Sequence, residues 1–263
     1  MRLFLEIFIR SVRRQMTYRA TILAGLATNY IFGLFRIAIL LALYGDRQSV
    51  AGVDIDGAVT YMVLIQALIG FLSMFSWFDL MQSVYTGEVS GDLLKPISLY
   101  TLWMARDLGR AAVQFVFRGL LIFALYLPFF DLAYPAGAGQ WLGLAIVIVL
   151  GWAVSFSWRF LVNLFAFWSP NALGIGRFLF ILSWFFSGFL MPLRYYPDWV
   201  VEIANLTPFP YMMNVVLDVF IGVLTGPDLF AVVMVQLAWI AALGLAGQVV
   251  LRAGVRRLVI LGG

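Results

Sequence analysis

A cluster of charged residues lies in the segment 86–110, TGEVSGDLLKPISLYTLWMARDLGR. Only 11% of the chain is charged, yet this short segment carries Glu88, Asp92, Lys95, Arg106, Asp107 and Arg110. A pore or a lipid-facing bundle has no use for such a segment. It is typical of a surface that a separate soluble protein binds, so the chemistry we expect of it is recognition.

Catalytic chemistry finds little support elsewhere in the chain. There is no Cys and no His, which removes thiolate nucleophiles, the commonest metal ligand and the usual proton shuttle. A Ser–His–Asp or Cys–His set therefore cannot form, and the phosphate-binding pattern G-x-x-x-x-G-K-[ST] is absent. We expect no enzyme activity, no metal site and no bound cofactor. The net charge of +4 is explained by membrane topology rather than by nucleic-acid binding.

Composition predicts an integral membrane protein. Hydrophobic residues make up 63% of the chain, and its mean hydropathy is +0.98. At about 20 apolar residues per crossing, the length allows roughly six spans, each of which must be a helix to satisfy its own backbone in lipid. We predict an all-α polytopic membrane protein, a single transmembrane domain over 1–263, with helices over 20–44, 58–80, 111–130, 141–167, 174–191 and 229–251.

The distribution of positive charge predicts how the chain is oriented. Five arginines precede the first span, the cluster at 86–110 follows the second, and three more close the chain: Arg252, Arg256 and Arg257. Only Arg47 and Arg194 fall on the opposite side, which is rich in Asp and Glu. Both termini and the charged cluster are therefore predicted to be cytoplasmic.

Residues 1–19 have the pattern of an amphipathic helix. At 100° per residue, one face carries Phe4, Leu5, Phe8, Ile9, Val12 and Met16, and the other carries Arg2, Glu6, Arg10, Arg13 and Arg14. Such a helix suits the inner membrane interface, with its arginines at anionic headgroups. A simple topology anchor is the alternative, and the two roles are compatible.

Pro96, which cannot continue a helix, divides the charged cluster at 86–110, and residues 86–98 form its first part. A helix of at most two turns is expected from Glu88 to Leu94, and the spacing of Glu88 and Asp92 places both carboxylates in the same direction. Such a helix could bind in a groove of a partner domain; an ordinary solvated loop is the alternative. The residues that we expect to make this contact are Glu88, Asp92, Leu93, Leu94, Lys95 and Pro96.

Irregular structure is expected after the fifth span, over 192–226. Prolines interrupt it repeatedly, Asp198 can cap a short helix, and the apolar stretch from Tyr211 to Val223 is too short to span a bilayer. A re-entrant segment at the outer leaflet fits this pattern. Its aromatic side chains form either an interfacial belt or an exit gate for an amphipathic substrate; the gate candidates are Tyr195, Tyr196, Trp199 and Phe209.

Two arginines fall inside predicted spans, where a charge is costly. Arg36 lies well within the first span and Arg118 about two turns into the third. Each requires water, a partner or a route by which its long side chain reaches the interface, so a structural role and a substrate-binding role both stay open. Arg159 and Asp79 lie nearer the cytoplasmic ends of their spans, where they could pair.

The segment GEVSGDLLKP between the second and third spans resembles the coupling region of ABC type-2 exporter permeases. Two further segments are similar to the same family: SFSWRFLVNLFAFWSPNALGIGRF at 155–178 and SGFLMPLRYYPDWVVEIANLTPFPYMMNVVLDVFIGVLTG at 187–226. The resemblance implies six helices, an amphipathic amino-terminal helix, a cytoplasmic coupling helix and short re-entrant helices outside. It also implies ABC ATPase subunits that hold ATP and Mg²⁺, and a second permease subunit; a heterodimer is favoured and a homodimer is the alternative.

Three functions are compared on this basis. The leading hypothesis is the permease of an ATP-driven exporter in the bacterial cytoplasmic membrane, which moves a drug, a lipid or a lipid-linked compound. The second is an ion-coupled secondary transporter, which should place an acid at mid-membrane; Asp79 is the nearest candidate. The third is a membrane scaffold that transports nothing. Membrane lipids are partners in every case.

Overall fold

The computed structural model describes residues 1–75, 77–169 and 171–257. Most of these residues are helical, and their elements in chain order are α1 (Arg2–Thr17), α2 (Arg19–Tyr44), β1 (Ser49–Val50), β2 (Val53–Asp54), α3 (Ile55–Leu68), α4 (Asp79–Tyr85), α5 (Val89–Leu93), α6 (Leu99–Gln114), the π-helix η1 (Phe115–Gly119), α7 (Leu120–Tyr126), α8 (Ala138–Asn163), the 3₁₀ helix η2 (Leu164–Phe167), α9 (Ala172–Phe186), the 3₁₀ helix η3 (Leu193–Tyr195), α10 (Asp198–Asn205), α11 (Asn214–Phe220) and α12 (Gly226–Val255).

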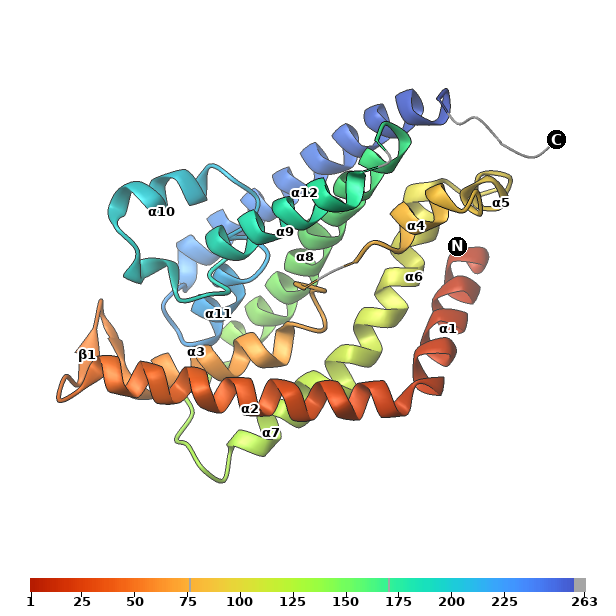
Figure 1. The fold of residues 1–263 in the computed structure, drawn as a ribbon. Coiled ribbons are helices and arrows are strands. Elements are labelled where there is room, and N and C mark those ends of the chain that lie inside the picture. The colour runs from red at the N-terminus through yellow and green to blue at the C-terminus, as the bar shows by residue number, and fades with distance from the viewer. Residues whose placement is uncertain (76, 170, 258–263) are drawn as a thin grey trace.

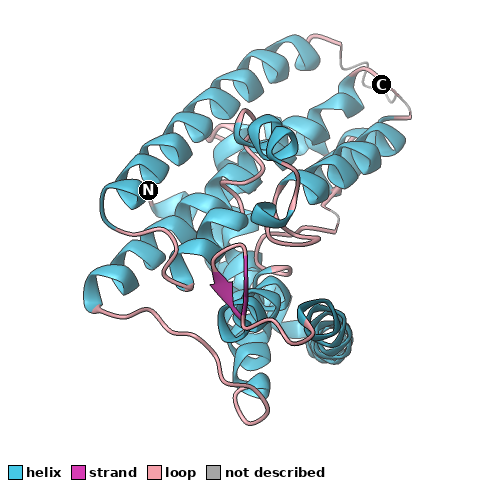
Figure 2. Cartoon of the chain, turned by 90° about the vertical axis from the view of Figure 1, so that its left-hand side faces the viewer, coloured by secondary structure: helices cyan, strands magenta, loops and turns pink. Residues whose placement is uncertain are grey.

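The long helices run between two ends of the molecule. The β1–β2 hairpin and α10 lie at one end, whereas α5, α1 and the last turn of α12 lie at the other, which we call the α5 end (Figure 1). Helix α8 packs against α12, α11 and α6, while α2 packs against α3 and α7. Viewed from the hairpin end, the two antiparallel strands are the only sheet among the described residues (Figure 2).

Four helical segments are long and apolar enough to cross a bilayer within the described residues: Ala20–Tyr44, Leu99–Tyr126, Ala138–Phe167 and Gly226–Val255. The other two expected spans are shorter. α3 has 14 residues and α9 has 15, which at 1.5 Å per residue gives about 21 and 22 Å, less than the hydrocarbon thickness of about 30 Å. The chain is thus a helical membrane protein, and the six-span layout stays a prediction.

The second expected span, 58–80, is not one helix. α3 begins before it, at Ile55, and ends at Leu68, and α4 begins only at Asp79. Between them the structure describes residues 69–75 and 77–78, and Ser73 has a φ of 52°. Neighbouring helices replace the lost helical hydrogen bonds, since side chains of α6 and α8 donate to the carbonyls of Gly70, Phe71, Leu72 and Trp77. Irregular backbone inside a membrane protein requires such partners.

The third expected span, 111–130, is longer and begins earlier than the sequence suggested. Ser98 caps α6 by accepting a hydrogen bond from the Thr101 backbone N–H at 3.1 Å, and the helix continues through η1 and α7 to Tyr126. The basic residues before position 111 therefore belong to the helix itself. The fifth helix also differs from the expected 174–191, because α9 ends at Phe186 and Gly188, with a φ of 78°, turns the chain.

α1 is a helix, as its pattern indicates, but one of its faces packs on α6. The Ser11 hydroxyl donates to the carbonyl of Arg106 at 2.6 Å. Gly109 makes this approach possible, because a Cβ there would lie 2.7 Å from the carbonyl oxygen of Phe8. Leu5 and Ile9 stay exposed on another face. Part of the expected apolar face therefore packs on α6, and the rest is free to contact the membrane interface.

Candidate functional site

The coupling candidate lies at the α5 end as a separate short helix (Figure 1). α5 covers only Val89–Leu93, and Glu88 occupies its N-cap position. Val89 is buried and holds the helix against the core. Glu88 is exposed, whereas Asp92 is 6% exposed. The expectation that both carboxylates face a partner is therefore wrong, because Asp92 turns inward.

Asp92 is held by two cations. Arg106 of α6 donates to both carboxylate oxygens, at 2.6 and 2.9 Å, and Lys95 donates to Oδ1 at 2.7 Å. Such a bidentate pair is among the stronger charge-assisted contacts. Burial raises the pKa of Asp92, but the hydrogen bonds and charges of Arg106 and Lys95 outweigh it and hold that pKa below its ordinary value. The carboxylate therefore stays ionised and ties α5 to α6.

The remaining coupling candidates form an outward surface. Leu94 is 87% exposed, an unusual position for a leucine beside a helix that packs on the core. Lys95 and Pro96 are exposed as well, and Leu93 is half-buried. We call Glu88, Leu94, Lys95 and Pro96 the α5 surface. It presents one apolar side chain among charged and rigid neighbours.

The residue after Arg106 begins a buried ionic network that sequence reasoning missed. Asp107 is 1% exposed and accepts from Arg159 of α8 at 2.8 and 3.1 Å. Arg110 and the indole N–H of Trp152 also donate to it, each at 2.9 Å. Arg159 therefore pairs with Asp107, and the expected pair with Asp79 does not form. The usable signal was Arg159 itself, since an arginine inside an apolar helix needs a buried acid.

This network also holds residues 70–72, which follow α3. Arg110 donates to the carbonyl of Gly70 at 2.7 Å and to that of Phe71 at 3.2 Å. Arg159 contacts the Ser155 hydroxyl, which donates to the carbonyl of Leu72 at 2.9 Å. The side chains of this network thus join α6, α8 and the break between α3 and α4, and the neighbouring Arg106 joins α6 to α5 through Asp92.

The two candidate arginines of the membrane lie apart. Arg36 on α2 donates to the carbonyl of Phe189 at 2.6 Å and stacks over its ring at 4.6 Å from the centroid. Arg118, in η1, donates to Asn29 Oδ1 at 2.7 Å, while its Nε has no partner among the described residues. Arg36 and Asn29 are seven positions apart on α2, about 10 Å. Both arginines contact protein groups, and the structure does not bring them into one site.

The four aromatic gate candidates occupy different surroundings. The Tyr195 hydroxyl lies 2.7 Å from that of Tyr44, and Tyr196 packs edge-on against Phe185 of α9. Phe209 is buried against Trp158. Trp199 is 65% exposed on α10. Phe209 therefore belongs to the core, and the gate formed by the four residues stays a prediction.

Comparison with protein families gives one match. A family model described as ABC-2 family transporter protein matches residues 30–262, nearly the whole chain. The comparison with curated proteins finds no match. Among the described residues, no group of three or more His, Cys, Asp or Glu side chains could hold a metal ion.

Proposed function

We propose, because the chain belongs to the ABC-2 family of transporters, that it is the membrane permease of an ATP-driven exporter whose ATPase binds the α5 surface. Membership of this family implies a membrane subunit that works with ABC ATPase subunits, so ATP and Mg²⁺ belong on that partner. Export, the contact residues and the bacterial cytoplasmic membrane are part of the proposal.

One observation carries this proposal. Helix α5 exposes Leu94 on its outer side, while an ion pair on its inner side joins it to α6. Leu94 is exposed for a partner to cover, and Asp92 joins the same short helix to Arg106. A force applied to α5 therefore reaches α6 without first unfolding a flexible loop. Because Asp107 directly follows Arg106 in α6, a movement of Arg106 also moves the buried network around Asp107.

The substrate proposed is an amphipathic or hydrophobic compound that leaves along a seam between two permease subunits. Exposed apolar side chains along α2, including Leu23, Phe32, Phe35 and Ile39, supply a surface that lipid or a second subunit must cover. We favour a second, related permease as the partner and keep a second copy of this chain as the alternative.

The buried acids disfavour an ion-coupled secondary transporter. Asp107 is paired with two arginines, and Asp218 is paired with Arg194 at 2.5 Å. Asp79, the acid that the sequence suggested for this role, lines a cavity at the α5 end. No buried carboxylate among the described residues is thus free to carry a proton across the membrane.

The test replaces Leu94 with Ser and asks whether an ATPase still copurifies from native membranes. Loss of one exposed leucine anchor should reduce recovery of the ATPase and transport together, while the thermal unfolding midpoint stays unchanged, because Leu94 supports no internal packing. Leu206→Ser is the matched control, since Leu206 is 79% exposed and follows α10 at the far end of the molecule. Unchanged recovery in Leu94→Ser, or copurification of no ATPase with the native chain, would refute the proposal; the latter result would favour a scaffold.

A further inference from the structure

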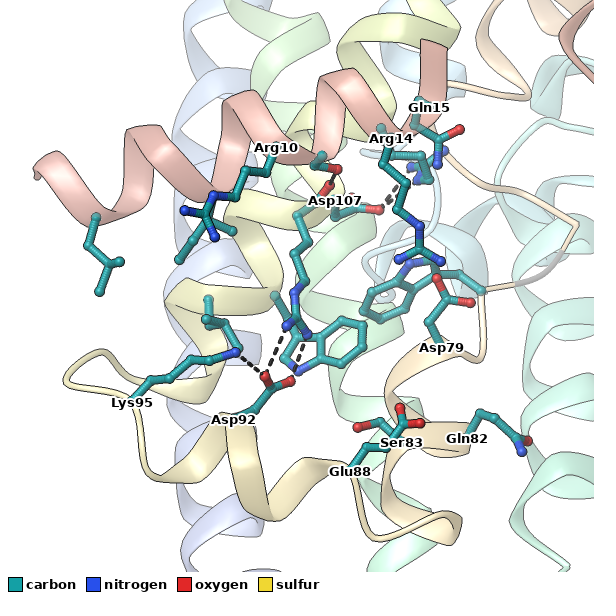
Figure 3. A pocket seen from close by; sticks show the side chains of 18 residues that line it. Arg10, Arg14, Gln15, Asp79, Gln82, Ser83, Glu88, Asp92, Lys95 and Asp107 are labelled. Atoms are coloured by element: carbon teal, nitrogen blue, oxygen red, sulfur yellow. Dashed lines mark hydrogen bonds and ion pairs between the residues drawn. The ribbon is translucent and has the colours of Figure 1, made fainter. Parts of the chain in front are cut away.

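A cavity of about 620 Å³, lined by charged and apolar side chains, lies beside α5, between α1, α6 and the segment that leads into α4. Figure 3 shows the side chains that line it. Its size falls within the range of about 300–1,000 Å³ that is usual for small-ligand sites. The coupling proposal rests on the exposed Leu94, which does not line this cavity, whereas Glu88 and Lys95 of the α5 surface do.

The cations along its walls fall into two groups. Lys95, Arg106 and Arg110 are engaged by the carboxylates of Asp92 and Asp107. Two further arginines of the lining, Arg10 and Arg14, extend from α1 (Figure 3). Within the described part of the chain, neither makes a side-chain hydrogen bond or an ion pair of 4.0 Å or less.

The opposite side of the cavity carries acids. Asp79 begins α4 and Glu88 precedes α5, and their side chains face the cavity across from α1 (Figure 3). Neither carboxylate has an ion-pair partner among the residues that the structure describes. The charges of the two walls that no internal ion pair engages are therefore opposite in sign: arginines on α1 and carboxylates across from it.

We infer that this cavity binds the phosphoethanolamine headgroup of a membrane phospholipid. Arg10 and Arg14 suit a phosphate, and Asp79 and Glu88 suit the ammonium group. A simple anion would leave two carboxylates facing it without compensation, whereas a zwitterion satisfies both walls.

Two observations favour a lipid over a free headgroup compound. α1 exposes Leu5 and Ile9 on a face that does not pack on α6, as expected of a helix in the membrane interface. Leu3 and Ile7 of the same helix also line the cavity, together with Leu102. An acyl or glycerol segment can therefore leave the cavity along apolar side chains of α1.

The experiment mixes the purified full chain in detergent with equal amounts of phosphatidylethanolamine and phosphatidylglycerol, and counts retained lipid by native mass spectrometry. The native chain should retain phosphatidylethanolamine preferentially. Arg10→Gln with Arg14→Gln should weaken retention of both lipids at least about tenfold, as expected for lost charge-assisted hydrogen bonds. Asp79→Asn should abolish the preference while phosphatidylglycerol is still retained.

Arg13→Gln is the matched control, because Arg13 lies on the same helix but does not line the cavity; its lipid retention should equal that of the native chain. If Arg13→Gln loses as much lipid as the double variant, basic residues attract lipid in general, and the inference is overturned. A native chain without preference, or an Asp79→Asn variant that keeps it, would overturn it as well. Soluble phosphoethanolamine should compete poorly with the lipid. If it displaces the lipid at equal concentration, the cavity binds the free headgroup compound, and the inference of a phospholipid is overturned.

Discussion

Replacing Asp107 with Asn tests whether the buried network holds the fold together. The change preserves the shape of the side chain but removes the charge that faces Arg159 and Arg110. Arg159 is 1% exposed, so its guanidinium would stay buried with only neutral acceptors. Arg110 is less affected, because its side chain is partly exposed and it also bonds two backbone carbonyls.

The expected loss of unfolding free energy follows from the burial of Arg159. Removing one partner of a buried ion pair typically costs about 3 to 5 kcal/mol, because the remaining charge is left uncompensated. For a chain of this size, about 1 kcal/mol lowers the midpoint of thermal unfolding by roughly 2 to 4 °C. Asp107→Asn should therefore lower the midpoint by roughly 6 to 20 °C.

The assay is thermal unfolding of the purified chain in detergent, followed by tryptophan fluorescence. A second variant, Asp107→Leu with Arg159→Met, removes both charges and should recover most of the loss, since an apolar pair of similar volume can replace a buried ion pair. A decrease of less than about 2 °C in Asp107→Asn would show that water reaches this site, and it would refute the reasoning from burial. Failure of the double variant to recover would assign the remaining loss to Arg110 and the Trp152 N–H, which also lose their acceptor when Asp107 becomes Leu.

The remaining predictions concern the attachments of α5 and α1. The pKa of Asp92 is lowered in the folded chain, so its stabilising pair with Arg106 is fully present above the unfolded value of about 3.9 and is lost as the pH falls through the lower folded value. Protection of the α5 amides from hydrogen exchange, relative to the intrinsic rate at each pH, should fall below about pH 4 in the native chain and should already be low at pH 7 in Asp92→Asn; equal protection in both at pH 7 would contradict the attachment. Gly109→Val should displace α1, because the Cβ alone would lie 2.7 Å from the Phe8 carbonyl oxygen; proteolysis between α1 and α2 should accelerate, and an unchanged cleavage rate would exclude the close approach.

Helix positions were the most predictable part of this fold. Long apolar runs locate α2, α8 and α12 well, because a span of 20 or more residues leaves little choice of structure in lipid. Pro96 correctly separates α5 from α6, for it cannot continue a helix and the following Ser98 caps the next one. Local chemistry decides each of these features.

Features that depend on side chains from distant segments were not predictable in the same way. The run 58–80 is apolar throughout its first half and reads as one span, yet it breaks because Arg110, Ser155 and Asn163 supply hydrogen bonds to its carbonyls. The direction of Asp92 was missed for a similar reason. Its inward position depends on Arg106, which is 14 residues away and belongs to another helix.

The break between α3 and α4 lies where a displacement of α5 would arrive. Asp92 joins α5 to Arg106, the adjacent Asp107 is bound by Arg110, and Arg110 holds the carbonyl of Gly70. A continuous helix would resist such a displacement along its whole hydrogen-bonded length, whereas an irregular segment held by side chains can exchange partners. The proposed coupling therefore requires both parts: a short helix outside the fold and a break inside it that can change its arrangement. A substitution that weakens this chain of contacts while the ATPase stays bound should leave ATP hydrolysis intact and reduce transport, which separates coupling from docking.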